Sequence, residues 1–207
     1  MAIKSYLAKI YAKITAGRVY SWAAKPYSAQ EHTFKDLISK ARTTSFGKDH
    51  HFDQINSYAD FSRLVPIRDY EEIKPYIERV KSGEADVLWP GRPLYFAKTS
   101  GTTSGAKYIP ITPVSMPYHI NATKEALLLH IYHTKKASFV NGKMIFLQGS
   151  PVLKEVNGIK TGRLSGIAAH YVPNYLQKNR LPSWETNCIE DWETKVDAIV
   201  RETADKD

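Results

Sequence analysis

A cluster of hydroxyl and glycine residues near the middle of the chain has the composition of a phosphate-binding loop. The cluster and the lysine after it consist of Thr99, Ser100, Gly101, Thr102, Thr103, Ser104, Gly105 and Lys107. Phosphate oxygens accept hydrogen bonds, so a site that holds them needs many donors that converge on one place. Glycine lets backbone N–H groups approach closely, hydroxyls add donors, and lysine adds a positive charge. These residues are therefore predicted to bind a nucleotide phosphate.

The spacing differs from that of the common nucleotide-triphosphatase loop, which requires G-x-x-x-x-G-K-[ST] between a strand and a helix. Counted from Gly101, the second glycine position holds Ala106, and Tyr108 stands where serine or threonine is needed. Because β-favouring residues follow the loop, we expect donor groups rather than a helix dipole to hold the phosphate. A flexible hairpin turn is the alternative, since Gly, Ser and Thr are common in turns.

Three stretches of the sequence resemble one enzyme family. Residues 98–110 read K-T-S-G-T-T-S-G-A-K-Y-I-P, which resembles the first ATP motif of the adenylate-forming superfamily, roughly [ST]-S-G-T-[ST]-x-G. Residues 44–50 (T-S-F-G-K-D-H) and 65–80 (V-P-I-R-D-Y-E-E-I-K-P-Y-I-E-R-V) resemble the auxin-responsive promoter family of acyl acid–amido synthetases, particularly its bacterial branch. The stretch between Gly105 and Lys107 is one residue shorter than in plant members, which leaves the role of Lys107 open.

This resemblance implies a two-step ligase reaction. A carboxylate attacks the α-phosphorus of ATP to give an acyl-adenylate and pyrophosphate, and the amine of an amino acid then displaces AMP to form an amide. The implied cofactors are ATP and Mg²⁺, and the implied partners are a small carboxylic acid and an amino acid. The first step needs no protein nucleophile, so no catalytic residue is assigned, and the protein contributes positioning and charge stabilisation.

Family members are much longer than this chain, and they carry later motifs for the adenine, the ribose and the metal. We therefore expect the chain to be the N-terminal portion of such an enzyme, inactive when isolated, with the metal ligands outside it. The competing interpretation is a small non-catalytic module that binds a nucleotide or another anion.

Charge suggests a further alternative, a nucleic-acid-binding module. The net charge is +8, and residues 1–50 hold nine Lys or Arg against three acids. A basic surface of this kind concentrates anions. The chain has no recognised nucleic-acid motif and no basic stripe interleaved with aromatics in the loop region, so no nucleic-acid partner is expected.

Histidine and cysteine give no metal or nucleophile prediction. His130 and His133 share a helix face without a visible third ligand, so no metal site is predicted. The lone Cys188 cannot form an internal disulfide, and we expect a small buried side chain in a reduced, cytoplasmic setting. His50, His51 and His170 are expected to be hydrogen-bonded structural residues.

Helical spacing of apolar residues dominates the first 88 residues. The first helix is indicated by a stripe that consists of Ile3, Tyr6, Leu7, Ile10, Tyr11 and Ile14. We expect this stripe to pack on the rest of the protein. The alternative is a helix that lies on an anionic membrane, because Lys4, Lys9 and Lys13 are interspersed. No stretch is apolar over the length needed to span a bilayer.

Further helical segments are expected before residue 89. The first has Phe34, Leu37, Ile38 and Ala41 at three- and four-residue spacings. The predicted helix N-caps are Ser57 and Asp69. Asp69 with Glu72 has the form of a capping box. Because Pro75 interrupts this helix early, the longer helical piece is predicted to start there and to run to Lys81, with Gly83 as its stop.

From residue 89 the pattern changes to strands. Residues 94–97 and 108–111 are predicted strands on either side of the hydroxyl-rich loop, and Pro110 restricts the second to an edge or a bulge. The other predicted elements are a helix from Ser115 to about Lys136, a buried strand at 144–147, a tight hairpin at Asn157-Gly158, and a final helix with the stripe Ile189, Trp192, Val196, Ile199 and Val200. By the same resemblance, the long helix, which contains Tyr118, His119 and Leu127, is a candidate to line an acyl pocket, and its apolar residues are equally explained as core.

The predicted fold class is α/β. Residues 1–88 form a mainly helical N-terminal segment, and residues 89–207 form the first part of an ATP-binding adenylation domain, which we expect to be incomplete. The last helix should have another element to pack against, so its apolar stripe is expected to be exposed and to promote self-association.

Overall fold

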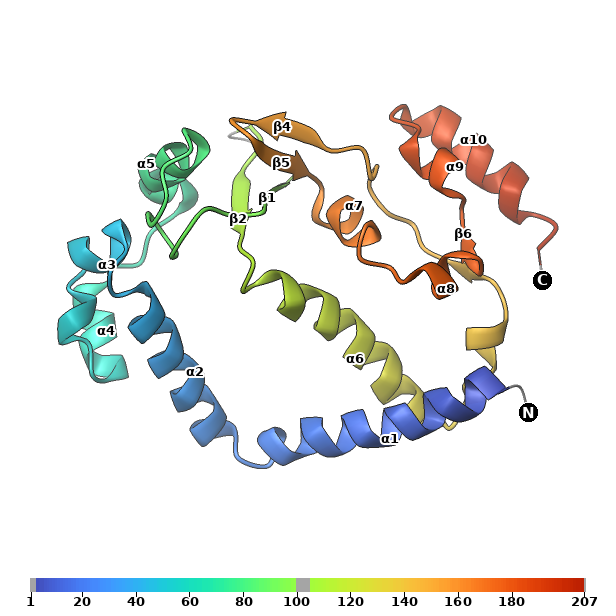
Figure 1. Ribbon diagram of the computed structural model, residues 1–207, viewed down its shortest axis with the longest axis horizontal. Helices are drawn as coiled ribbons and strands as arrows, with labels where there is room; N and C mark the ends of the chain where they lie inside the picture. Colours follow the sequence, from blue (N-terminus) through green and yellow to red (C-terminus); the bar gives the residue numbers. More distant parts are fainter. Residues whose placement is uncertain (1–2, 100–104, 207) are drawn as a thin grey trace. The chain divides into compact units, whose positions relative to one another are not determined.

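The computed structural model describes residues 3–99 and 105–206, with only the backbone of residue 175 described (Figure 1). These residues form two compact units. Unit 1 combines residues 1–21, 114–153 and 162–207, and unit 2 combines residues 22–113 and 154–161. Helices and strands both occur, so the predicted α/β class is confirmed. The functional division of the chain at residue 88 stays a prediction.

The first half of unit 2 is helical. Its elements are α2 (Pro26–Ala41), α3 (Ser45–Asp49), η1 (Phe52–Gln54), α4 (Tyr58–Leu64) and α5 (Tyr70–Lys81). Ile38, Ala41, Phe52 and Ile55 are buried together between α2, α3 and η1, and burial of this apolar surface stabilises the group. Ser57 and Asp69 both cap their helices, as predicted, and Asp69 forms the predicted capping box with Glu72. Ser57 also forms a capping box, with Asp60.

The prediction that Pro75 marks the start of the longer helix is wrong. Helix α5 runs unbroken from Tyr70 to Lys81 with Pro75 inside it. A proline this close to a helix start removes a single hydrogen bond from the first turns, and the Asp69 capping box satisfies other orphan N–H groups there. Gly83 has a φ of +97°, a left-handed conformation that suits glycine and ends the helix as predicted.

A four-stranded sheet completes unit 2, in the order β2 (Tyr108–Ile111), β1 (Tyr95–Lys98), β5 (Ile159–Gly162) and β4 (Lys154–Val156). Pro110 therefore lies on an edge strand, as predicted, where its missing N–H breaks no ladder. Asn157 and Gly158 have positive φ angles of 48° and 78° and form the predicted tight hairpin between β4 and β5. Phe96 and Ile159 of the sheet pack with Val80 of α5 in one buried cluster.

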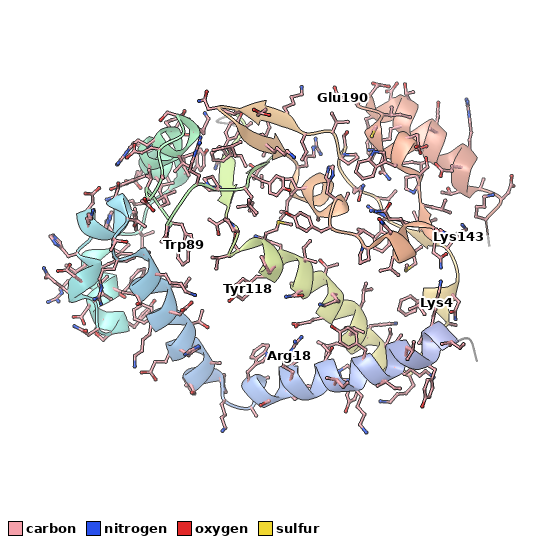
Figure 2. All side chains as sticks on the ribbon, in the orientation of Figure 1. Lys4, Arg18, Trp89, Tyr118, Lys143 and Glu190 are labelled. Carbon is pink, nitrogen blue, oxygen red and sulfur yellow. The ribbon has the colours of Figure 1, made fainter. Side chains whose placement is uncertain are left out.

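Unit 1 contains two long helices, α1 (Ile3–Ala23) and α6 (Met116–Thr134), and several short elements. The short elements are η2 (Ser138–Asn141), β3 (Met144–Ile145), α7 (Leu164–Ala169), α8 (Asn174–Gln177), β6 (Arg180–Leu181) and α9 (Trp184–Cys188), followed by α10 (Trp192–Thr203). Ala12 of α1 is buried against Leu128 and Ile131 of α6, together with Ala137. Arg18 extends from α1 toward α6 (Figure 2), where its guanidinium pairs with Glu125.

The expected packing face of α1 is wrong. The large apolar stripe is exposed, with Ile3 at 78% and Ile14 at 64%, and the opposite face is buried instead. That buried face consists of Ser5, Ala12, Thr15 and Ala16. Small side chains let two helix backbones approach closely, so this face and not the aliphatic one meets α6. Among the described residues, no helix is long and apolar enough to cross a membrane.

Two further expectations about unit 1 need correction. The apolar run at 144–147 forms a strand over only two residues, and Leu147 is 71% exposed rather than buried. Strand β3 pairs in parallel with β6, and each of the two strands has only two residues. Cys188 is half-buried rather than buried.

Helix α10 exposes two residues of the predicted apolar stripe. Trp192 is 64% exposed and Val200 is 56% exposed, whereas Val196 and Ile199 are half-buried. The residue that α10 does bury is Lys195, whose ammonium donates to the carbonyl of Asn187 at 2.7 Å. Burial lowers the pKa of Lys195.

Candidate nucleotide-binding site

The strands β1 and β2 bring the two ends of the hydroxyl-rich loop together. They pair antiparallel with Lys98 opposite Tyr108, and the N–H of Thr99 donates to the carbonyl of Lys107 at 3.0 Å, one step beyond the last strand pair. No helix starts at Gly105, because the chain continues into β2, and α6 begins only at Met116. The predicted strand–loop–strand arrangement is therefore confirmed for the flanks of the loop.

Three of the predicted loop residues are described. Thr99 is exposed, Gly105 is exposed with a φ of +78°, and Lys107 is partly buried. A Cβ atom at Gly105 would meet nothing within 4 Å, so glycine is needed there for its backbone conformation and not for space. The remaining predicted residues, Ser100, Gly101, Thr102, Thr103 and Ser104, lie outside the described residues.

Two aromatic side chains and two lysines gather at the base of the loop. The backbone N–H of Tyr108 donates to the hydroxyl oxygen of Tyr70 at 2.8 Å. The ammonium nitrogen of Lys107 lies 5.3 Å from the centre of the Tyr70 ring, and that of Lys81 lies 4.6 Å from the centre of the Tyr108 ring. Both distances fit a cation–π contact, which is an attraction between a positive charge and the negative ring face.

The base of the loop has an excess of positive charge. Lys81 pairs with Glu78 at 2.8 Å, whereas across residues 3–99 and 105–206 no carboxylate forms an ion pair with Lys98 or Lys107. Lysines without an anionic partner raise the local concentration of anions such as phosphates. The charge of this region therefore suits the predicted ligand.

The two upstream stretches that carry the family resemblance pack against each other. Ser45 accepts a hydrogen bond from Arg79 at 2.8 Å, and the Tyr76 hydroxyl donates to Asp49 at 2.8 Å. Burial, and then the hydrogen bond to the Asp49 carboxylate, raise the pKa of Tyr76. Helix α5 is thereby fixed against α3, and Tyr70 at the start of α5 is placed beside β2.

Sequence reasoning missed Tyr70 and Lys81. Both lie in α5, the helix that precedes the loop in the sequence, and they stand at its opposite ends. An aromatic residue and a lysine at helix ends are ordinary features, and their relation to the loop becomes visible only when α5 packs on β2. The one signal available was the place of Tyr70 inside the family-like stretch at 65–80.

The predicted histidine roles divide into two groups. His50 and His170 each bond a backbone carbonyl at 2.8 Å, as expected of structural residues. His51 is exposed with a φ of 52°, and a structural role for its side chain stays a prediction. His133 lies 2.6 Å from the Tyr20 hydroxyl, and His130 contacts the ring of Phe139. In the part of the chain that is described, no group of three or more His, Cys, Asp or Glu side chains is placed to hold a metal ion.

The candidate acyl-pocket residues of α6 are not core residues of unit 1. Tyr118 is 70% exposed, Leu127 is 41% exposed, and His119 is exposed as well. Tyr118 extends away from the axis of α6 (Figure 2). Other apolar residues of the same helix, Met116, Leu128 and Ile131, are buried, as the core alternative expects. The role of α6 in an acyl pocket stays a prediction.

Comparisons with known proteins agree with the resemblance. The GH3 family N-terminal domain matches residues 16–203. Jasmonoyl–L-amino acid synthetase JAR4 of Nicotiana attenuata is 24% identical over 136 residues, which cover 64% of this chain and 23% of that protein. The 4-substituted benzoates–glutamate ligase GH3.12 of Arabidopsis thaliana is 32% identical over 81 residues, which cover 39% of this chain and 14% of that protein.

The fold agrees as well. The solved structure of the AtGH3.15 acyl acid amido synthetase in complex with 2,4-DB aligns with a TM-score of 0.65 at 20% identity, over 73% of this chain and 27% of that one. The chain thus spans about a quarter of the length of these relatives. Because the family match covers residues 16–203, which is most of the sequence, the chain belongs to the GH3 family and corresponds to its N-terminal domain.

Proposed function

We propose that this chain is the N-terminal portion of an ATP-dependent acyl acid–amido synthetase. In the first reaction a carboxylate is adenylated with release of pyrophosphate, and in the second the acyl group passes to the amine of an amino acid with release of AMP. The observation that carries the proposal is the loop of Thr99 to Lys107, which two paired strands close at its base in a GH3-family chain. Named relatives are amido synthetases and ligases.

The loop is proposed to hold the phosphates of ATP. Ser100, Thr102 and Thr103 donate their hydroxyls, the N–H groups around Gly101 and Gly105 approach the phosphate oxygens, and Thr99, Ser104 and Lys107 complete the site. A set of hydroxyls, amides and ammonium groups fits an anion and not a metal ion. Mg²⁺ prefers carboxylate and other oxygen ligands, so its ligands are assigned to the remainder of the enzyme.

The substrates are proposed to be a small carboxylic acid and an amino acid, in a cytoplasmic setting. We propose the bacterial branch of the family, because the stretches at 44–50 and 65–80 resemble that branch in particular. The transferred chemistry requires positioning and charge stabilisation by the protein and needs no nucleophilic side chain.

A product assay on the complete ligase that carries this chain tests the proposal. With ATP, Mg²⁺ and a panel of carboxylic acids, we expect pyrophosphate release that depends on the acid. Amide formation should depend in addition on an amino acid. The 207-residue chain alone should form no amide. If both the complete protein and the 207-residue chain bind ATP and neither releases pyrophosphate in response to an acid, a non-catalytic nucleotide-binding module is supported instead.

A further inference from the structure

We propose that Tyr70 is a positioning residue for nucleotide binding, and that it acts by orienting the Lys107 ammonium toward the phosphates of ATP. This inference rests on the proposed function and explains how Lys107, at the end of the loop, is held in position. It depends only on described residues at the base of the loop. Tyr70 contacts two consecutive residues, the ammonium of Lys107 and the backbone of Tyr108.

The hydroxyl of Tyr70 fixes the backbone that carries Lys107. Strand β2 is at the edge of its sheet, so its N–H groups are not all used by a neighbouring strand. The N–H of Tyr108 donates instead to the Tyr70 hydroxyl at 2.8 Å. Since Lys107 precedes Tyr108 and its carbonyl accepts from Thr99, the main chain of Lys107 is held on both sides.

The ring of Tyr70 fixes the side chain of Lys107. A lysine has a flexible four-carbon stem, so an ammonium in water would sample many positions. The Lys107 nitrogen lies 5.3 Å from the centre of the Tyr70 ring, within the range of a cation–π contact. Such a contact leaves the other faces of the ammonium able to donate to an anion. The ring therefore limits the positions of the Lys107 ammonium and leaves its charge in place. A carboxylate partner would neutralise that charge.

Tyr70 can serve as a support because it is itself held in place. It is the first residue of α5, directly after the Asp69 capping box. The same helix is anchored further along by Ile77 and Val80, which are buried, and by the Tyr76–Asp49 hydrogen bond. Tyr76 also provides a matched control, because it is a partly buried tyrosine on α5 whose hydroxyl donates to Asp49 of α3.

The test uses four variants of the complete ligase: Tyr70→Phe, Tyr70→Leu, Lys107→Met, and the Tyr70→Leu/Lys107→Met pair, with Tyr76→Phe as the control. We expect Tyr70→Leu to raise the KM for ATP by about threefold to tenfold, the range that an exposed or partly buried cation–π contact supports. Lys107→Met removes the ammonium itself and should raise the KM for ATP by at least as much. Tyr70→Phe keeps the ring but loses the hydroxyl that accepts from the Tyr108 N–H, so its KM for ATP should rise by less than that of Tyr70→Leu, about twofold to threefold. The paired variant should resemble Lys107→Met alone, because the two residues act through one ammonium.

Two readouts separate positioning from a merely structural effect. The KM for the carboxylic acid should not change in Tyr70→Leu, whereas a general loosening of the fold would raise both KM values. In the 207-residue chain without nucleotide, the NMR signal of the Lys107 side-chain methylene next to nitrogen should carry a ring-current shift. Tyr70→Phe and Tyr76→Phe should keep this shift and Tyr70→Leu should abolish it.

The outcomes distinguish this inference from the function on which it rests. Two outcomes would overturn the positioning role and leave the ligase assignment intact. The first is that the KM effects add in the paired variant. The second is that Tyr70→Leu has a normal KM for ATP while Lys107→Met has a raised one. A Lys107→Met enzyme with a normal KM for ATP would remove Lys107 from the phosphate site and overturn the inference with it. Absence of acid-dependent pyrophosphate release from wild-type enzyme would contradict the proposed function itself.

Discussion

Nε2 of His50 accepts a hydrogen bond from the guanidinium of Arg68 at 3.1 Å, while Nδ1 of the same ring donates to the carbonyl of Phe46 at 2.8 Å. A guanidinium can only donate and a carbonyl can only accept, so the two partners fix the imidazole as the neutral form with its proton on Nδ1. His50 is 4% exposed. This bond joins the stretch at 44–50 to the stretch at 65–80, and thus links α3 to the segment that leads into Tyr70.

Loss of the Arg68 guanidinium should therefore destabilise unit 2. Arg68→Met leaves the buried Nε2 of His50 without a donor, and we expect the free energy of unfolding to fall by about 1–3 kcal/mol. The control is Arg63→Met, which removes a surface ion pair with Asp60 and should cost less than about 1 kcal/mol. Urea denaturation of the chain measures both. Equal losses in the two variants would show that the His50–Arg68 bond contributes nothing specific.

Alkaline pH should weaken the contribution of Tyr76. Burial and the hydrogen bond to Asp49 raise the pKa of Tyr76 above its ordinary value of 10.0. The folded state then holds the phenolic proton more tightly than the unfolded state. The stabilisation is fully present below about pH 10 and is lost as pH rises through the raised pKa.

Tyr76→Phe isolates this effect from those of the other titrating groups. The difference in unfolding free energy between wild type and variant should be constant between about pH 8 and pH 10 and should shrink above that range. Urea denaturation at a series of pH values measures it. A difference that stays constant to about pH 11 would contradict a raised pKa in the folded state.

Two glycines in helices should respond to alanine with opposite signs. A Cβ atom at Gly47 in α3 would lie 2.1 Å from the backbone carbonyl oxygen of Ala41, which cannot move away alone. We expect Gly47→Ala to cost about 3 kcal/mol, at the upper end of the usual range for overpacking. A Cβ atom at Gly17 in α1 meets nothing within 4 Å, so Gly17→Ala should stabilise the chain by about 0.5–1 kcal/mol. Thermal unfolding compares the two, and a stable Gly47→Ala protein would disprove the close approach of α2 and α3.

Local patterns in the sequence predicted the elements of the site better than their packing. The Asn157-Gly158 turn, the Asp69 cap and the edge position of Pro110 each follow from the chemistry of a few neighbouring residues, and each is confirmed. The hydroxyl-rich loop was placed between two strands for the same reason.

Features that depend on distant partners were not predictable in this way. The aliphatic stripe of α1 gave a clear helical period, yet the face that packs is the one with Ser5 and Ala12, because close approach to α6 selects small residues. Pro75 suggested a break in the helix, but α5 begins at Tyr70 after the Asp69 cap and continues through Pro75. The relation of Tyr70 to Lys107 joins residues that are 37 positions apart in the sequence and has no local signature.

The exposed face of α10 should make the isolated chain associate. Trp192 and Val200 present apolar surface to solvent, and contiguous apolar surface favours self-association. We expect the 207-residue chain to show a concentration-dependent increase in mass by light scattering. Trp192→Lys together with Val200→Lys should reduce it, and Glu193→Lys, which changes charge beside the stripe without removing apolar surface, should have a smaller effect. A wild-type chain that stays monomeric at all concentrations would contradict the expectation.

Carboxylate-dependent exchange of labelled pyrophosphate into ATP tests the phosphate-loop assignment most directly, because it reports adenylation before any amide forms. In the complete ligase, Gly101→Leu should abolish exchange, since the side chain would occupy the space assigned to phosphate. Thr102→Ala should lower the exchange rate by a factor equivalent to about 1–3 kcal/mol, the value of a hydrogen bond to a charged group. Gly17→Leu, at a position where a Cβ atom meets nothing within 4 Å, serves as the matched control and should exchange normally. Normal exchange by the Gly101→Leu enzyme would contradict the assignment of the loop as the ATP-phosphate site.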